Sequence, residues 1–296
     1  MMTNKEILFN LIQKSFKNEV FLFESSDERA LLQMIIENGL VGLIFKAIDK
    51  SSFKHENYYL RLKSSFNEYI SKDIRQTHYI NELSRLFSNE SIDHVFLKGA
   101  VLKILYPNSY MRGMGDIDLL VRLADFESSK KILESNDYKY LSATSHHHVY
   151  ETIDHISIEL HQSIISIVDY ENDILLKEVW SYVEDGLDYY KRLKPEFEYV
   201  YLLTHLIRHI RTSGIGIRSI IDIYVYLDAY YEKMDKTLLK ELLNLTHSLV
   251  FHQKVQRIND IIFGNIKSEK KDDDVIDYLI FSGIHGKGTK HDPYIT

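Results

Sequence analysis

Two aspartates separated by a single residue, Asp116 and Asp118, are the side chains of this chain whose type and spacing most directly indicate chemistry. They open an apolar stretch ending at Val121, which the pattern predicts to be a short buried strand. Because side chains alternate along a strand, the two carboxylates share one face, while Ile117 and Leu119 occupy the other. Holding two carboxylates together costs stability unless a cation binds there, and Mg²⁺ is commonly held by carboxylates together with substrate phosphates. The spacing therefore predicts a divalent-cation site suited to phosphoryl chemistry.

The elements around this strand predict a small αβ unit. An apolar strand over residues 92–97, a helix over 100–105 closed by Pro107, and the strand over 116–121 form one βαβ-like unit. An amphipathic helix is expected next, followed by three more strands; the ranges are 124–135 for the helix and 138–143, 147–152 and 156–160 for the strands. In the last strand the apolar residues alternate with Glu159 and His161, so these two polar side chains lie on one face.

Helices are predicted on both sides of this unit. Before it, the apolar spacing predicts helices over residues 5–16, 41–48 and 55–86, and another that follows an N-cap within Ser25-Ser26-Asp27 and ends near Gly39. After Trp180, the acidic, glycine- and proline-containing stretch up to Glu198 is interpreted as a linker. Further helices are expected over 196–211, 218–231 and 236–263, then a charged loop over 267–274 and a loosely ordered tail after Gly286. These patterns divide the chain into regions 1–90, 91–184 and 196–296.

The order of these motifs resembles a known superfamily. Gly99 after an apolar strand, then a helix and the Asp116-Ile117-Asp118-Leu119 strand, resembles the nucleotidyltransferase superfamily of DNA polymerase beta. More closely, LKGAVL, YMRGMGDIDLLV, IELH, HLIRHI and GIRSIIDIY resemble a bacterial family of uncharacterised nucleotidyltransferases, over roughly residues 30–285. The resemblance implies a mixed α/β (α+β) fold, in which a polymerase-beta-like core with a small mixed sheet is flanked by N- and C-terminal helical regions.

The resemblance also implies an activity and its residues. It implies transfer of a nucleoside monophosphate from an NTP to an acceptor hydroxyl, with pyrophosphate released and with Mg²⁺ (or Mn²⁺) as cofactor. Asp116, Asp118 and Glu159 are the implied catalytic residues and metal ligands, although an exposed strand face is an alternative interpretation of Glu159. The expected nucleotide-binding residues are Lys98, Gly99, Arg112, His161, Arg208 and Arg218. Ala100 stands where a serine is common, so a phosphate contact must come from backbone N–H groups or from a base such as Lys98 or Arg112.

Arginines and histidines outside the core motif carry open alternatives. A metal–triphosphate site built only from residues 95–161 would leave the base and ribose exposed, so we expect the helices after residue 196 to form the far wall, with His205, Arg208 or Arg218 facing the ligand. The turn over residues 213–216 is a candidate hinge or close-approach loop. The i,i+4 spacing of His205 and His209 would suit a metal if a third ligand approached, but packed, hydrogen-bonded histidines are the simpler interpretation. For Arg218 with Asp222, the simpler interpretation is an i,i+4 ion pair that stabilises the helix.

Three consecutive histidines, His146 to His148, raise the hypothesis of a zinc site. Neighbours on a strand point to opposite faces, so three in a row cannot all bind one ion. We therefore expect at most one of them, His148, to line a substrate cleft. His161 is expected either to orient a carboxylate or phosphate or to cap the sheet edge.

Composition excludes several classes of function. The net charge is −7, from 36 basic and 43 acidic residues, so no extended nucleic-acid surface is expected. Cysteine is absent, which excludes disulfides and thiolate chemistry. No run of 18 apolar residues and no secretory cleavage pattern are found, so we expect no membrane partner and a cytoplasmic location.

The acceptor is left open by the sequence: a small molecule, a sugar, a protein or an RNA end all fit. Two other functions are also kept. One is a catalytically silent nucleotide-binding regulator or toxin-system partner, which would bind nucleotide without releasing pyrophosphate. The other is a protein-interaction adaptor built on the helical regions, which would show no metal-dependent nucleotide binding. Fold analogy alone does not choose among them.

Overall fold

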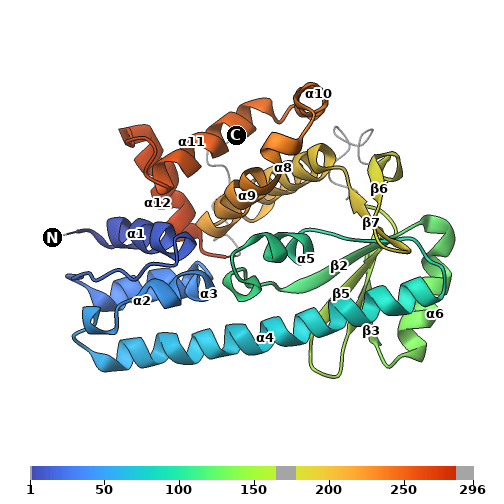
Figure 1. Ribbon diagram of the computed structural model, residues 1–296, viewed down its shortest axis with the longest axis horizontal. Coiled ribbons are helices and arrows are strands. Elements are labelled where there is room, and N and C mark those ends of the chain that lie inside the picture. Colours follow the sequence, from blue (N-terminus) through green and yellow to red (C-terminus); the bar gives the residue numbers. More distant parts are fainter. Residues whose placement is uncertain (1, 165–177, 285–296) are drawn as a thin grey trace.

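A seven-stranded mixed sheet, in the order β3-β4-β5-β2-β1-β7-β6, forms the right half of the molecule in Figure 1. The computed structural model describes residues 2–164 and 178–284. The strands are β1 (His94–Phe96), β2 (Asp116–Val121), β3 (Lys139–Ala143), β4 (His147–Glu151), β5 (Ser157–His161), β6 (Val183–Asp185) and β7 (Tyr190–Leu193). β2 runs parallel to β5 and β1 runs parallel to β7, whereas the other neighbours are antiparallel. The predicted strand–helix–strand order is therefore present, but its two strands are adjacent and antiparallel, so the unit is not a βαβ unit with parallel strands.

Helices cover both faces of the sheet and form the rest of the molecule (Figure 1). The α-helices are α1 (Asn4–Phe16), α2 (Glu28–Glu37), α3 (Val41–Ile44), α4 (Glu56–Asn89), α5 (Gly99–Leu102), α6 (Phe126–Ser135), α8 (Pro195–Thr212), α9 (Ile217–Tyr230), α10 (Lys236–Leu245), α11 (Leu249–Ile262) and α12 (Lys270–Ser282). Asp27 caps α2 through Ala30 N–H, as predicted. The mixed α/β architecture with helical flanks is confirmed, whereas the division at residues 90, 184 and 196 into separate domains stays a prediction.

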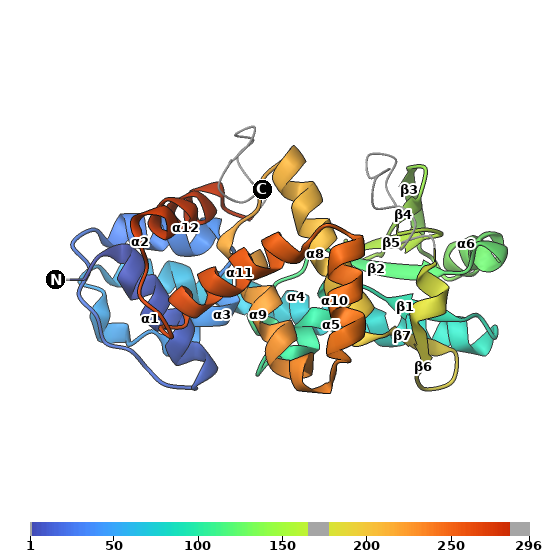
Figure 2. The same cartoon turned by 90° about the horizontal axis from the view of Figure 1, so that it is seen from above.

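The sheet separates two hydrophobic cores. On one face, Ile117 and Leu119 pack with Phe87 of α4 and Leu133 of α6. On the other face, Leu120 belongs to a larger core that continues through α8 and α9 into the N-terminal helices. Figure 2 shows α11 and α12 beside α1 and α2, at the end of the molecule away from the sheet. Since Asp116 and Asp118 alternate with the residues of the first core, the acidic face of β2 looks toward the C-terminal helices.

The stretch interpreted as a linker is part of the sheet, so that interpretation is wrong. β6 and β7 form a hairpin, and β7 adds to β1 in parallel with His94 opposite Tyr190. The turn requires glycine at Gly186, where a Cβ atom would lie 2.4 Å from the carbonyl oxygen of Tyr190. Tyr190 packs on Phe96, and Leu193 is buried in the larger core, so the segment has the apolar contacts of a strand despite its polar composition.

Two predictions for the C-terminal region also need correction. The helix expected over 236–263 is two helices, because His247 has φ 52° and the hydroxyl of Thr246 turns back to Leu242 O and Ser248 Oγ. The loop expected over 267–274 contains the first turns of α12, whose Asp272 is buried and accepts two hydrogen bonds from Arg257. The tail predicted after Gly286 lies outside the described residues.

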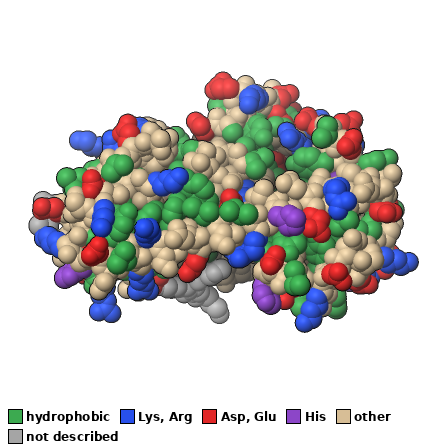
Figure 3. All heavy atoms as spheres, turned by 60° about the horizontal axis from the view of Figure 1, so that its bottom comes forward, with side chains coloured by type: hydrophobic (Ala, Val, Ile, Leu, Met, Phe, Trp, Pro, Cys, Tyr) green, Lys and Arg blue, Asp and Glu red, His purple; other side chains and the backbone are tan. Residues whose placement is uncertain are grey.

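In the described part of the chain, no single helix has the length and apolar character of a membrane span. The bent pair Glu28–Glu37 and Val41–Ala47, which turns by 115°, meets those two criteria only when its members are taken together. Most of its apolar residues are buried in the larger core or packed against it. On the face over α4, acidic and basic side chains are interspersed, so that face has no field of a single sign (Figure 3).

Glu198 of α8 is a buried carboxyl whose replacement should stabilise the protein at alkaline pH. Burial raises its pKa to about 7, although Tyr226 Oη donates a hydrogen bond to it. The folded pKa lies above the unfolded value, so this carboxyl's stabilising contribution is full below about pH 4.5 and is lost as pH rises through about 7. At pH 8, Glu198→Gln should raise the free energy of unfolding by up to about 3 kcal/mol.

Urea denaturation at pH 5 and pH 8 measures this effect. The gain should be below about 1 kcal/mol at pH 5, where the parent carboxyl is largely protonated. Glu241→Gln, on the exposed face of α10, is the matched control and should change little at either pH. A pH-independent effect of Glu198→Gln would contradict the prediction.

Candidate active site

Three carboxylates lie on one face of two neighbouring strands. Asp116 and Asp118 extend from β2, and Glu159 extends from β5, which runs parallel to β2 with Asp118 opposite Glu159. Residues opposite each other on adjacent strands point to the same side of a sheet, so the register places Glu159 beside the aspartates. The predicted face-sharing of Asp116 and Asp118 is therefore confirmed, and the register adds Glu159 to that face, whereas the catalytic roles of the three stay a proposal.

Asp118 is the one of the three carboxylates whose negative charge is balanced by neighbouring positive groups. Its side chain is buried, and Oδ1 accepts hydrogen bonds from Lys98 Nζ at 2.7 Å and from His161 Nε2 at 2.9 Å. Burial opposes ionisation, but the charges of Lys98 and His161 outweigh it and hold the pKa of Asp118 well below its usual range. His161 Nε2 also lies 3.3 Å from Glu159 Oε2, and although burial opposes its protonation these two carboxylates raise the pKa of the imidazole. Of the two expectations for His161, orienting carboxylates fits its contacts, and capping the sheet edge does not, because β5 is an interior strand.

Asp116 lacks such compensation. Burial and the neighbouring charges of Asp118 and Glu159 raise its pKa to about 6. The positive charges of Lys98 and His161 do not neutralise all three carboxylates, so the site attracts a further cation. The donors are carboxylate oxygens, the ligands preferred by Mg²⁺ and Mn²⁺. The residues present therefore fit a divalent cation.

The turn that presents Lys98 has an unusual backbone. Lys98 has φ 47° and ψ −111°, a conformation that L residues rarely adopt and that costs about 1–3 kcal/mol. Its ion pair with Asp118 is the contact that holds this side chain over the acids. At Gly99, a Cβ atom would lie 2.6 Å from Met114 Cγ and 2.8 Å from Arg112 Nη1. A larger residue here would displace the side chains of Met114 and Arg112, so glycine lets the loop before β2 approach closely.

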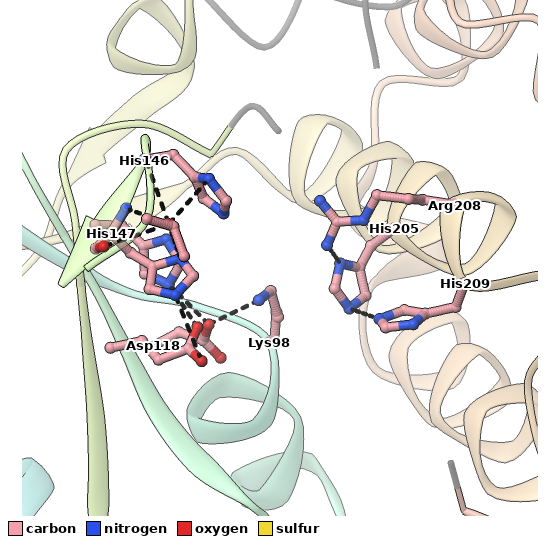
Figure 4. A network of polar contacts seen from close by, with 10 residues as sticks. Lys98, Asp118, His146, His147, His205, Arg208 and His209 are labelled. Atoms are coloured by element: carbon pink, nitrogen blue, oxygen red, sulfur yellow. Dashed lines mark hydrogen bonds and ion pairs between the residues drawn. The ribbon is translucent and has the colours of Figure 1, made fainter. Parts of the chain in front are cut away.

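Helix α8 faces the acids across a cavity of about 510 Å³ (Figure 4). His205, Arg208 and His209 line its far wall together with Tyr201. His205 Nδ1 accepts a hydrogen bond from Arg208 at 2.9 Å, and His205 Nε2 lies 2.9 Å from His209 Nε2, which bears out the interpretation of hydrogen-bonded histidines. Burial lowers the pKa of His205 well below its ordinary value, so it faces the cavity as a neutral ring. The structure therefore brings the C-terminal helices to the acids, as predicted.

The arginines at the floor of the cavity pair differently from the prediction. Asp222 accepts hydrogen bonds from Arg112 Nε at 3.3 Å and Nη2 at 3.0 Å, and from Tyr106 Oη at 2.7 Å. No ion pair joins Arg218 to Asp222 in the described residues, so the predicted i,i+4 pair is wrong. Burial and the adjacent charge of Arg112 lower the pKa of Arg218. The loop before β2 brings Arg112 against α9, although Arg112 is remote from Asp222 in the sequence. The planar guanidinium of Arg112 then matches the carboxylate of Asp222 and replaces Arg218 as its partner.

Two of the three consecutive histidines, His146 to His148, face the cavity. His146 and His147 line it, because His146 precedes β4 and is not bound by the alternation of a strand. His148 points to the other face and packs edge-on against Phe126. The prediction that His148 lines the cleft is therefore wrong, and the alternation argument fails only at the strand end. The turn over residues 213–216 contributes Ser213, Gly214 and Ile215 to the cavity.

A second cavity of about 320 Å³ adjoins the first and was not expected from the sequence. The two share Arg112, Gly115, Arg218 and Ile284, and the second is walled by Tyr69 and Lys72 of α4. Burial and the charges of Arg75 and Arg218 lower the pKa of Lys72, although Asp116 opposes the shift. Lys72 falls in a long polar helix pattern, so no local signal distinguishes it from a solvent-exposed lysine.

Comparison with known sequences is consistent with this geometry. Residues 24–263 match the model of a family described as uncharacterised nucleotidyltransferases, and the matched span contains the three carboxylates, the Lys98–Gly99 turn and the far wall. Because the match covers most of the chain, the protein belongs to this nucleotidyltransferase family, whose general reaction is nucleotide transfer. No curated protein matches the chain.

Proposed function

We propose that this protein transfers a nucleoside monophosphate from an NTP to an acceptor hydroxyl and releases pyrophosphate. The observation that carries the proposal is the row of Asp116, Asp118 and Glu159 on one sheet face, opening into a cavity whose other walls hold Arg112, Arg208 and Arg218. Acids at one wall and bases around the rest suit a metal-bound, polyanionic substrate. Family membership supports the general reaction.

Each residue has a distinct part in the proposed reaction. Asp116, Asp118 and Glu159 would hold Mg²⁺ (or Mn²⁺), and the bound ion would supply positive charge for the leaving pyrophosphate. Lys98 and His161 keep Asp118 ionised and fixed in position. The acceptor oxygen forms a bond to the α-phosphorus as the bond from that phosphorus to the bridging oxygen of pyrophosphate breaks. Glu159 accepts the acceptor's hydroxyl proton.

The arginine pair serves the negative charge of the substrate. Arg112 is held in place by Asp222, whereas Arg218 has no carboxylate partner among the described residues and lies where the two cavities meet. A guanidinium in this position offers hydrogen bonds to phosphate oxygens at little cost in rearrangement. Lys72 adds a third cationic group to the second cavity. We assign these side chains to the anionic part of the substrate.

Two labels on one NTP test the proposal. The protein is incubated with Mg²⁺ or Mn²⁺, a cell extract and each NTP in turn, labelled at the α- or the γ-phosphate. Transfer of α-label, but not γ-label, to an acceptor together with release of pyrophosphate is the expected result. Metal-dependent nucleotide binding without pyrophosphate release would instead indicate the silent regulator, and no metal-dependent binding would indicate the adaptor. The fraction that carries the label identifies the acceptor as a small molecule, sugar, protein or RNA.

Arg218→Ala should weaken binding of ATP with Mg²⁺ by about tenfold to a hundredfold, since hydrogen bonds to charged groups contribute about 1.5–3 kcal/mol. Stability should be unchanged or slightly higher, because a partly buried guanidinium without a carboxylate partner is removed. Calorimetric titration measures the affinity. Arg211→Ala, at an exposed position of α8, is the control for loss of one positive charge. Equal affinities for the parent and Arg218→Ala would remove Arg218 from the substrate site.

A further inference from the structure

A cluster of metal-ligating side chains lies beside the aspartates and crosses two strands. His147 of β4 stands directly opposite His161 of β5 in an antiparallel pair, and Glu159 is two residues from His161. The three side chains therefore share one face, and their ligand atoms lie within 4.8 Å of one another. Because strand register holds the cluster, its geometry is a property of the sheet rather than of a loop.

The separations suit a single metal ion. His161 Nε2 lies 3.3 Å from Glu159 Oε2, and His147 Nε2 lies 3.9 Å from Glu159 Oε1. In a tetrahedral site with metal–ligand bonds of about 2.1 Å, neighbouring ligand atoms lie about 3.4 Å apart. The two contacts are made to different oxygens of Glu159 and lie close to this value, and the three ligand atoms lie within 4.8 Å of one another, so rotation of the side chains can bring one atom of each to a single ion.

A supporting hydrogen bond orients His147. Its Nδ1 lies 3.2 Å from Thr144 Oγ1, and Thr144 N–H donates to the carbonyl oxygen of His147. When Nδ1 donates its proton to the threonine, Nε2 carries the lone pair that a metal requires, an arrangement typical of histidine ligands. His146 lies next to His147, with ring centroids 4.4 Å apart, but it is not one of the three clustered ligands (Figure 4).

We propose that His147, Glu159 and His161 form a binding site selective for Zn²⁺, Co²⁺ or Mn²⁺ over Mg²⁺. Imidazole nitrogen is a good ligand for transition metals, whereas Mg²⁺ takes oxygen ligands and keeps much of its water. In the metal-free protein His161 Nε2 donates its proton to Asp118 and lies beside Glu159, so metal binding releases this proton to solvent and places the ion next to both carboxylates. This proposal rests on the proposed function and deepens it by naming the ion nearest Glu159. The site binds its metal ion without a nucleotide.

Cobalt spectroscopy of the metal-free, full-length protein tests the site without any activity measurement. Co²⁺ bound by two imidazoles and a carboxylate absorbs visible light more strongly than the hydrated ion does. We expect this absorption to saturate at one Co²⁺ per chain, to vanish on addition of stoichiometric Zn²⁺ and to survive about a hundredfold excess of Mg²⁺. His147→Ala should weaken Co²⁺ binding by at least about tenfold. His146→Ala, which lines the same cavity, is the control and should retain it.

A second variant guards against loss of folding. His147→Gln keeps a polar side chain of similar size, and circular dichroism verifies the fold of each variant. Parent-like Co²⁺ affinity in both His147 variants, or displacement of Co²⁺ by equimolar Mg²⁺, would overturn the inference. Pyrophosphate release with Mg²⁺ in a protein that shows no Co²⁺ band refutes this site and leaves the proposed function standing. Co²⁺ binding without pyrophosphate release supports the site and rejects the function.

Discussion

Asp116→Asn is expected to lower the rate of pyrophosphate release by about 10³-fold, equivalent to about 4 kcal/mol of transition-state stabilisation. Asparagine is isosteric, so the change removes only the charge that attracts the cation. The fold should keep its stability or gain slightly, because Asp116 is the carboxylate whose pKa burial and the charges of Asp118 and Glu159 raise to about 6. Its removal relieves repulsion rather than breaking an ion pair.

The neighbouring aspartate provides the contrast. Asp118→Asn removes the partner of Lys98 and His161 and leaves the partly buried ammonium of Lys98 without its counter-charge. This variant should therefore lower the rate of pyrophosphate release and also lower the free energy of unfolding, the latter by about 3–5 kcal/mol. Pyrophosphate release and differential scanning calorimetry on both variants separate the two effects. A folded Asp116→Asn variant with the parent's turnover would contradict the assigned role of this carboxylate.

Asp222→Asn should lower the free energy of unfolding by about 3–5 kcal/mol, the largest structural effect that we expect outside the acidic row. Asp222 is 6% exposed and accepts hydrogen bonds from Arg112 and from Tyr106. Without its charge, the guanidinium of Arg112 is buried with no counter-ion and beside that of Arg218. Urea denaturation measures the loss.

Two further variants test the physical reason for that loss. Asp228→Asn lies on the exposed side of the same helix and should change stability by less than about 0.5 kcal/mol. Arg112→Met combined with Asp222→Leu removes both charges and should recover much of the stability, so the two sites should be strongly non-additive. Unfolding of Asp222→Asn at the parent's urea midpoint would show that the pair contributes nothing to the fold.

Much of the acidic site could be read from the sequence because it depends on local periods. The period of two along a strand places Asp116 and Asp118 on one face whatever the rest of the fold, and β2 spans the predicted residues Asp116–Val121. The same period pairs Glu159 with His161 on β5. Helix starts were equally local, as the cap from Asp27 to α2 illustrates, because a cap satisfies backbone groups within its own turn.

Partner choice between distant segments was decided only by the tertiary structure. The i,i+4 spacing of Arg218 and Asp222 permits an ion pair, but the chain brings Arg112 to Asp222 from 110 residues away. β7 joins the sheet because β1 offers an open edge, although its sequence has the polar composition of a linker. His147 meets His161 and Glu159 through the register of β4 on β5, which no single segment encodes. Local periodicity selects the face on which a side chain lies, whereas packing of remote elements selects what it meets there.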